Sequence, residues 1–145
     1  MASEYSKRMT LADASVQRFL ATKQIALLAT VRADGAPLAM PMWFLHDAAT
    51  LTMISEEGTK KVHHLRRDPR VCVVVESGED AAHIRGVTVL GRAEFLTDGP
   101  GRRALAERFH EKYPSLAGLW GGRAMPYNRV MFRIVPERVK SWGLA

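Results

Sequence analysis

The sequence predicts a single, mainly β domain, closed into a barrel of six or seven mostly antiparallel strands with a few helices. Apolar and β-branched segments of strand length follow one another between turn signals. Helical segments are too few to alternate with them, which disfavours a doubly wound α/β fold. Closure into a barrel is favoured because it removes exposed sheet edges.

Length and composition agree with one domain. A chain of 145 residues can bury a core without disulfide bridges. We expect residues 1–10 to form a loose tail and residues 11–145 to form the domain. A lone cysteine, Cys72, excludes an intramolecular disulfide and a cysteine-rich zinc site, and favours the reducing cytoplasm. The longest apolar run, 25–31, is far shorter than the roughly 20 residues of a membrane span, and the first residues lack the apolar segment of a secretory signal.

The first half of the chain predicts a helix followed by a strand meander. The pattern Thr10–Asp13 resembles a capping box and opens an amphipathic helix over 11–22. Asp34-Gly35 is a hairpin signal, and Pro41 marks a strand edge or a bulge. Strands are predicted over 24–32, 38–46 and 50–55.

The second half mixes helices with longer strands. A short helix over 59–67 is stopped by Asp68-Pro69, and a second helix runs from about 98 to 113. Residues 114–128 form a Gly- and Pro-rich loop. Strands are predicted over 71–76, 87–95 and 130–134, and the last continues past a break at Pro136 over 135–142, as one strand or two. Val89, Val130, Phe132 and Ile134 should be buried.

Familiar catalytic devices are missing from the sequence. There is no phosphate-binding glycine loop, no dinucleotide fingerprint and no nucleophile elbow. The five histidines form no metal-binding pair, and Cys72 lies in an apolar run where thiols usually pack. We therefore predict no catalytic side chain and no metal site.

The net charge of +6 is partly concentrated in residues 60–70. Nucleic-acid binding would need a longer basic stripe with base-reading groups. The single cluster suits a phosphorylated small molecule better, although a solvated helix face explains it too.

The helix at 59–67 is the best candidate for a binding site. It begins at Thr59, so free backbone N–H groups and the positive end of the helix dipole point toward the same place. Lys60, Lys61 and His64 share one arc beside the apolar edge of the helix. This arrangement predicts a phosphate site, and the alternative is a surface helix whose lysines are merely solvated.

A flat apolar ligand is the second expectation. The run 40–44, Met-Pro-Met-Trp-Phe, could wall a planar ring, although barrel packing explains the run equally simply. Ile54 and Ser55 end the strand before the helix and suit the edge of such a ring.

Several blocks in this order resemble the pyridoxamine 5′-phosphate oxidase-like split β-barrels. The likeness extends over about residues 11–142. Its blocks are residues 27–37, 41–44, 59–71, 91–94 and 136–142.

The resemblance implies a split β-barrel homodimer that binds flavin mononucleotide (FMN) or the deazaflavin coenzyme F420 in a groove between subunits. It implies phosphate contacts from the helix at 59–67 and a ring lying against three strands. The residues that match the cofactor site are Thr30, Pro41, Met42, Trp43, Ile54, Ser55, Thr59, Lys60, Lys61 and His64.

The branch of the family is indicated by one missing motif. True pyridoxamine phosphate oxidases carry an arginine and a lysine for the flavin phosphate where this chain has residues 39–44. The segment 61–69 looks more like the deazaflavin-dependent reductases, although His64 replaces a common asparagine and Thr59 an occasional arginine. We therefore expect an F420-dependent oxidoreductase that transfers a hydride to a small conjugated substrate, with FMN as the alternative cofactor. A non-enzymatic carrier of flavin, deazaflavin or haem is the rival class.

Overall fold

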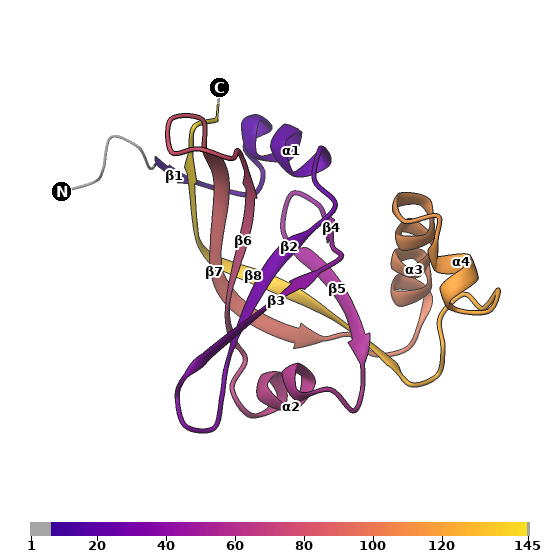
Figure 1. Ribbon diagram of the computed structural model, residues 1–145. Helices are drawn as coiled ribbons and strands as arrows, with labels where there is room; N and C mark the ends of the chain where they lie inside the picture. Colours follow the sequence, from indigo (N-terminus) through magenta and orange to yellow (C-terminus); the bar gives the residue numbers. More distant parts are fainter. Residues whose placement is uncertain (1–6, 145) are drawn as a thin grey trace.

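The computed structural model describes residues 7–144, which form one strongly curled antiparallel sheet with helices around it (Figure 1). The strands are β1 Lys7–Met9, β2 Ala26–Val31, β3 Pro37–Met42, β4 Leu45–His46, β5 Leu51–Glu56, β6 Arg70–Ser77, β7 Arg85–Phe95 and β8 Arg129–Trp142. The helices are α1 Ala14–Ala21, α2 Lys60–Arg67, α3 Pro100–Lys112 and α4 Leu116–Leu119. None of the described helices is long and apolar enough to span a membrane.

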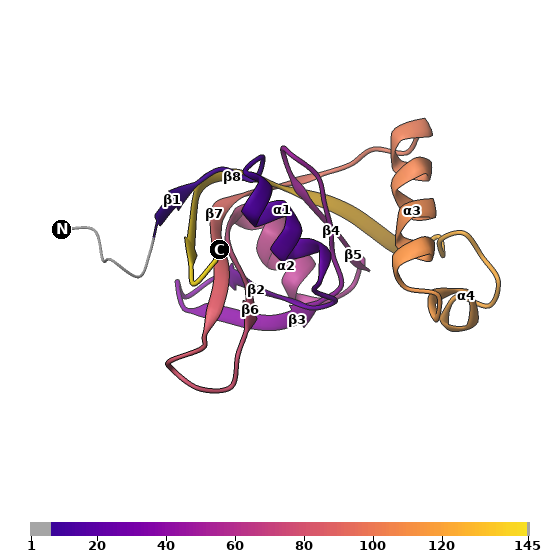
Figure 2. The same ribbon diagram turned by 90° about the horizontal axis from the view of Figure 1, so that it is seen from above.

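The barrel is split between two strands that are consecutive in the chain. The strand order is β3-β2-β6-β7-β8-β5-β4, with β1 paired to β8. Strands β3 and β4 therefore stand at opposite ends of the order, although only Trp43 and Phe44 separate them. Seen from above, the sheet curls around α1 and α2, which lie over opposite ends of the barrel (Figure 2). The predicted antiparallel, mainly β barrel is confirmed in its split form.

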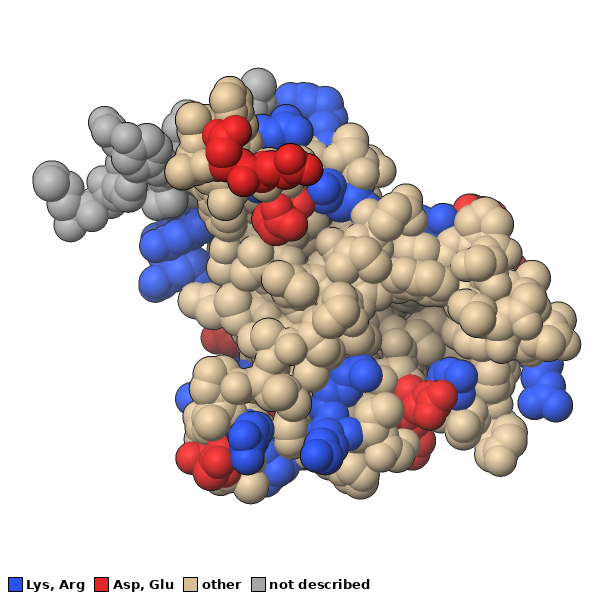
Figure 3. Space-filling view, viewed as in Figure 1, with Lys and Arg blue, Asp and Glu red and all other residues tan. Residues whose placement is uncertain are grey.

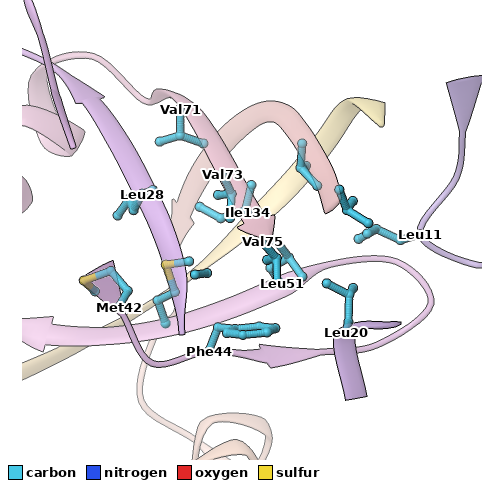
Figure 4. Packing of buried hydrophobic residues seen from close by; sticks show 14 of the residues in the cluster. Leu11, Leu20, Leu28, Met42, Phe44, Leu51, Val71, Val73, Val75 and Ile134 are labelled. Carbon is cyan, nitrogen blue, oxygen red and sulfur yellow. The ribbon is translucent and has the colours of Figure 1, made fainter. Parts of the chain in front are cut away.

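The barrel interior is filled by inward-facing side chains. Alternation along β6 buries Val71, Val73 and Val75 and leaves the residues between them partly exposed. These valines meet Leu28, Met42, Phe44, Leu51 and Ile134 from other elements (Figure 4). Three of the four residues expected to be buried are buried in the structure: Val89, Phe132 and Ile134. Val130 is only half-buried, because it pairs with Ser55 near one end of the strand.

The predicted strand 38–46 is wrong as one element. It breaks at Trp43–Phe44, where the backbone N–H of Phe44 donates to the hydroxyl of Tyr113 at 2.9 Å instead of to a strand. The two fragments then join opposite ends of the sheet. Pro41 does lie on an edge strand, as expected, since β3 pairs only with β2.

The N-terminal prediction also needs correction. Residues 7–9 are not a loose tail but pair with β8, while residues 1–6 lie outside the described residues. The first helix begins at Ala14, three residues later than the pattern predicts. Asp13 precedes it, and its carboxylate accepts from the backbone N–H of Thr10 at 2.7 Å.

The last strand runs through Pro136 as one element, so of the two alternatives left by the sequence the single strand is the observed one. The pairing of β7 with β8 has a bulge at Leu90/Gly91, next to Pro136, where it skips one residue of β8. The strand therefore continues through the proline. A Cβ at Gly91 would lie 2.2 Å from the carbonyl oxygen of Val135, so only glycine fits this crossing. The predicted loop 114–128 holds the short helix α4.

Candidate functional site

Helix α2 covers one end of the barrel and presents a basic face. Val62 and Leu65 are buried against the barrel, which fixes the rotation of the helix. Lys60, His64 and Arg67 follow at positions i, i+4 and i+7, so they lie on one face. This face turns toward the tip of the β2–β3 hairpin.

A pocket of 460 Å³ opens between that face and the hairpin. We call it the basic pocket; its lining residues are Arg32, Ala33, Asp34, Leu38, Lys60, His64 and Arg67. Two of its charges are partly engaged: Arg32 lies 3.4 Å from the carboxylate of Asp34, and Arg67 donates to the carbonyl of Val31 at 2.7 Å. Three cations against one carboxylate leave the pocket positive.

His64 is positioned by Thr30, a buried residue of β2. The hydroxyl of Thr30 lies 3.0 Å from His64 Nδ1, so Nε2 is the ring nitrogen left to meet a ligand. Burial, followed by the charges of Arg67, Arg32 and Lys60, lowers the pKa of His64 below 6.5. The imidazole is therefore mainly neutral at pH 7 and has one N–H donor. It gains a second N–H donor only when it is protonated in more acidic solution.

The first turn of α2 offers backbone donors. The hydroxyl of Thr59 donates to the carbonyl of Glu56 at 2.9 Å and lies 3.3 Å from the hydroxyl of the buried Ser55. No side chain caps the helix, so the N–H groups of its first turn remain open to an anion.

Some basic side chains of the cluster predicted from the sequence pair with carboxylates outside the basic pocket. Arg66 binds both carboxylate oxygens of Glu57 at 2.8 and 2.9 Å. Arg70 pairs with Asp68 at 2.7 Å and lowers the pKa of that carboxyl to about 2. Lys61 is half-buried and does not line the basic pocket. The basic side chains in the lower part of Figure 3 lie over α2.

The residues expected around a ring do not face one common space. Met42 is buried in the barrel core, while Pro41 is exposed on the edge strand. Ile54 and Ser55 are consecutive in β5 and so point to opposite faces of the sheet. Ser55 faces α2, whereas Ile54 and Trp43 pack toward α3 and α4.

A second pocket, of 300 Å³, lies on that α3–α4 side. We call it the aromatic pocket; its lining residues are Trp43, Ile54, Phe109, Leu116, Leu119, Trp120 and Arg129. The ring of Trp43 stacks on the ring of Tyr113, with 4.4 Å between the ring centroids and 8° between the ring planes. The hydroxyl of Tyr113 accepts from Phe44 N–H and donates to the carbonyl of Gln24 at 2.7 Å, which ties α3 to the barrel. Sequence reasoning missed this pocket, because four separate segments build it.

The outer face of β3, β2, β6 and β7 is largely apolar. One row across the strands is Pro41, Leu27, Val74 and Thr88, and the next row is Ala39, Ala29, Cys72 and Leu90. Leu27 is 42% exposed and Leu90 45%. Charged side chains are sparse in the middle of this face (Figure 3). Burial raises the pKa of the Cys72 thiol, which makes it a packing group and not a nucleophile.

Metal ligands do not gather in the part of the chain that the structure describes. Residues 7–144 hold no group of three His, Cys, Asp or Glu side chains placed to bind an ion. His83 pairs with Asp80 in the β6–β7 turn and is not near His64.

Comparison with known proteins gives a family match. The family model described as pyridoxamine 5′-phosphate oxidase matches residues 12–143. A putative pyridoxamine 5′-phosphate oxidase from Listeria innocua is 28% identical, with 88% of this chain and 95% of that chain covered and a TM-score of 0.69. Among curated proteins, none matches the chain.

Two further solved structures share the fold at lower identity. A heme storage protein from Vibrio cholerae is 17% identical over 94% of this chain and 98% of its own, with a TM-score of 0.78. An F420 reductase is 24% identical over 80% of this chain and 88% of its own, with a TM-score of 0.61.

Proposed function

The chain belongs to the pyridoxamine 5′-phosphate oxidase family of split β-barrels, and we propose on that premise that it is an oxidoreductase that uses the deazaflavin coenzyme F420. In this proposal a hydride passes between the bound cofactor and a small conjugated organic substrate. FMN is the alternative cofactor. A carrier role without turnover, for flavin, deazaflavin or haem, is the alternative to enzymatic activity.

The basic pocket is the observation that carries the proposal. Lys60, Arg67 and Arg32 surround it, and Asp34 is its one carboxylate. FMN presents a single phosphate, whereas F420 presents a phosphodiester and a carboxylate-rich tail. A pocket with three cations, two of them only partly engaged, beside an open helix N-terminus suits the more highly charged cofactor.

The remaining predicted site residues divide the work of binding. We expect Lys60, His64 Nε2 and the N–H groups following Thr59 to hold the anionic part, with a smaller contribution from Lys61, which does not line the pocket. In this proposal the ring lies at the split between β3 and β4 and contacts only part of the predicted set, since Ile54 and Ser55 point to opposite faces of β5. The predicted set is Thr30, Pro41, Met42, Trp43, Ile54 and Ser55.

The chemistry of the reaction comes from the cofactor, which supplies or accepts the hydride when bound. The chain's residues bind it, orient it and exclude water. The apolar side chains at the split are suited to exclusion, because they offer no competing proton donor to the reacting face. We therefore assign no side chain as general acid or base.

A second copy of the chain is part of the proposal. The two apolar rows on the outer face leave Leu27 and Leu90 nearly half exposed in one chain, and a stable dimer would cover them. Light scattering at micromolar concentration should give twice the chain mass. Leu27→Asp should give a monomer, because it places a charge in the contact.

Titration of tryptophan fluorescence with F420 and with FMN tests the cofactor assignment. We expect tighter binding of F420, and weaker binding at 500 mM than at 50 mM NaCl, because the contacts lie near the surface. Tighter binding of FMN would favour the flavin alternative. Tight F420 binding with no reduction of any conjugated acceptor would favour the carrier.

A further inference from the structure

We propose that the aromatic pocket is the substrate subsite and that it takes a planar aromatic or conjugated carboxylate. Its role as a substrate site rests on the proposed function. The ligand class rests only on the side chains that line the pocket.

The walls of the pocket are suited to a flat apolar body. Trp43 is held by its stack on Tyr113, and Trp120 is 9% exposed with its ring edge-on to His110 at 5.3 Å. Leu119 stands at the rim and is 69% exposed. A volume of 300 Å³ matches a small two-ring ligand and is too small for a whole nucleotide cofactor.

One cation stands among these apolar walls. Arg129, at the start of β8, is the single charged residue lining the pocket, and its side chain is 19% exposed. The guanidinium donates to the side-chain oxygen of Asn128 at 2.7 Å and lies 3.3 Å from the carboxylate of Glu56. An arginine carries five N–H donors in a planar fork, so donors remain for a ligand carboxylate.

The arginine is also held in place. Arg102 of α3 donates to the backbone carbonyl of Arg129 at 2.9 Å, which links the helix to the start of the strand. A charge fixed beside an apolar cavity interacts more strongly with an anion than one in water does. The combination therefore selects an acid over a neutral compound of the same shape.

The pocket adjoins the proposed ring position. Trp43 and Ile54 belong both to the predicted ring wall and to this lining, whereas Lys60 and His64 line the basic pocket. A ligand here would meet the apolar end of the cofactor and not its anionic end.

Binding of 2-naphthoate, with 2-naphthamide as the neutral match, tests the proposal on the full chain. The chain has three tryptophans. Trp142 ends β8 and packs on Gly86, far from the pocket, so the Trp142→Phe protein reports from Trp43 and Trp120 alone. We expect naphthoate to quench this fluorescence and to bind about tenfold more tightly than the amide, as for a charge-assisted contact.

Three variants separate charge from shape. Arg129→Gln should remove the preference for the acid and leave amide binding within about twofold. Glu56→Gln should tighten naphthoate binding several-fold, because the competing carboxylate is gone, and it serves if the arginine variant does not fold. Leu119→Ser, on the exposed rim, should weaken both ligands alike.

Naphthoate binding is then measured again in the presence of saturating F420, which decides whether the pocket is separate from the cofactor site. Binding of naphthoate in the presence of the cofactor supports a separate substrate subsite. Displacement of naphthoate by F420 would overturn the inference, because the pocket would then hold the cofactor ring, and so would equal affinity for acid and amide. If F420 fails to bind but naphthoate keeps its tenfold preference, the proposed function fails while the ligand class of the pocket stands.

Discussion

The basic pocket and the aromatic pocket differ in how the chain builds them and in what they can hold. The basic pocket is made by two local units, a hairpin tip and one face of α2, and is lined mainly by charged side chains. The aromatic pocket takes residues from β3–β4, β5, α3–α4 and β8 and contains a single charge. The first suits the anionic end of a cofactor. The second suits an apolar ring, so the two pockets would take chemically different ligands.

The largest expected effect separates two adjacent lysines in the first pocket. Lys60→Ala should weaken F420 binding by about 1–3 kcal/mol, or roughly fivefold to 150-fold, because it removes a charge-assisted contact. Lys61→Ala is the matched control on the same turn, and it should cost less because Lys61 does not line the pocket. Titration of both variants by fluorescence decides this. A larger loss for Lys61 would place the phosphate on the other side of the helix.

Folding stability should respond in the second region and not in the first. Tyr113→Phe removes the hydroxyl that bonds Phe44 N–H and the Gln24 carbonyl, so urea unfolding should show a loss of about 1–3 kcal/mol. Neither Lys60→Ala nor the control Tyr127→Phe, at a side chain 95% exposed, should change stability by more than about 0.5 kcal/mol. An unchanged midpoint for Tyr113→Phe would mean that water replaces the lost bonds.

The pH dependence of cofactor binding should sharpen the role of His64. Its pKa is lowered by burial and by neighbouring cations, and a bound anion favours the protonated ring. F420 affinity should therefore rise several-fold as the pH falls from 7 to below 6.5, and His64→Gln should flatten that rise. Affinity that rises equally in the variant would assign the proton to another group.

The smallest effect is on the stability of the unliganded protein and has the opposite sign. An unfolded chain takes up a proton at His64 near pH 6.5, while the folded chain does so at lower pH. Stability should therefore fall as the pH drops through 6.5 toward the folded pKa. The wild-type slope should exceed that of His64→Gln. The difference isolates His64, since the pKa of His46 is lowered as well.

Local pattern was enough to predict most of the elements. Alternation and turn residues predicted the β2–β3 hairpin, β6 and β7, and proline and glycine at the helix boundaries predicted α2 and α3. The break at Trp43–Phe44 could not be predicted in this way. At the break the N–H of Phe44 donates to the hydroxyl of Tyr113, which lies 69 positions away in the chain. For the same reason the split between β3 and β4 cannot be predicted from local sequence pattern.

The two pockets show the same limit. Lys60 and His64 share a helix face by simple geometry, so the sequence predicts them together. Arg32 was not predicted as a site residue. The turn residues of its hairpin predict the hairpin itself, but not the contact between the hairpin tip and α2. Nothing in the sequence around Trp43, Trp120 or Arg129 says that they converge, since only the closed fold brings them together.

A crystal structure of the protein with bound F420 tests the central claim most directly. The account predicts that the phosphodiester lies within hydrogen-bond reach of Lys60 Nζ and His64 Nε2, with the tail between Arg32 and Arg67. The deazaflavin ring should lie at the split between β3 and β4, with the aromatic pocket left open. A phosphodiester bound away from the face of α2 that carries Lys60, His64 and Arg67 would contradict it.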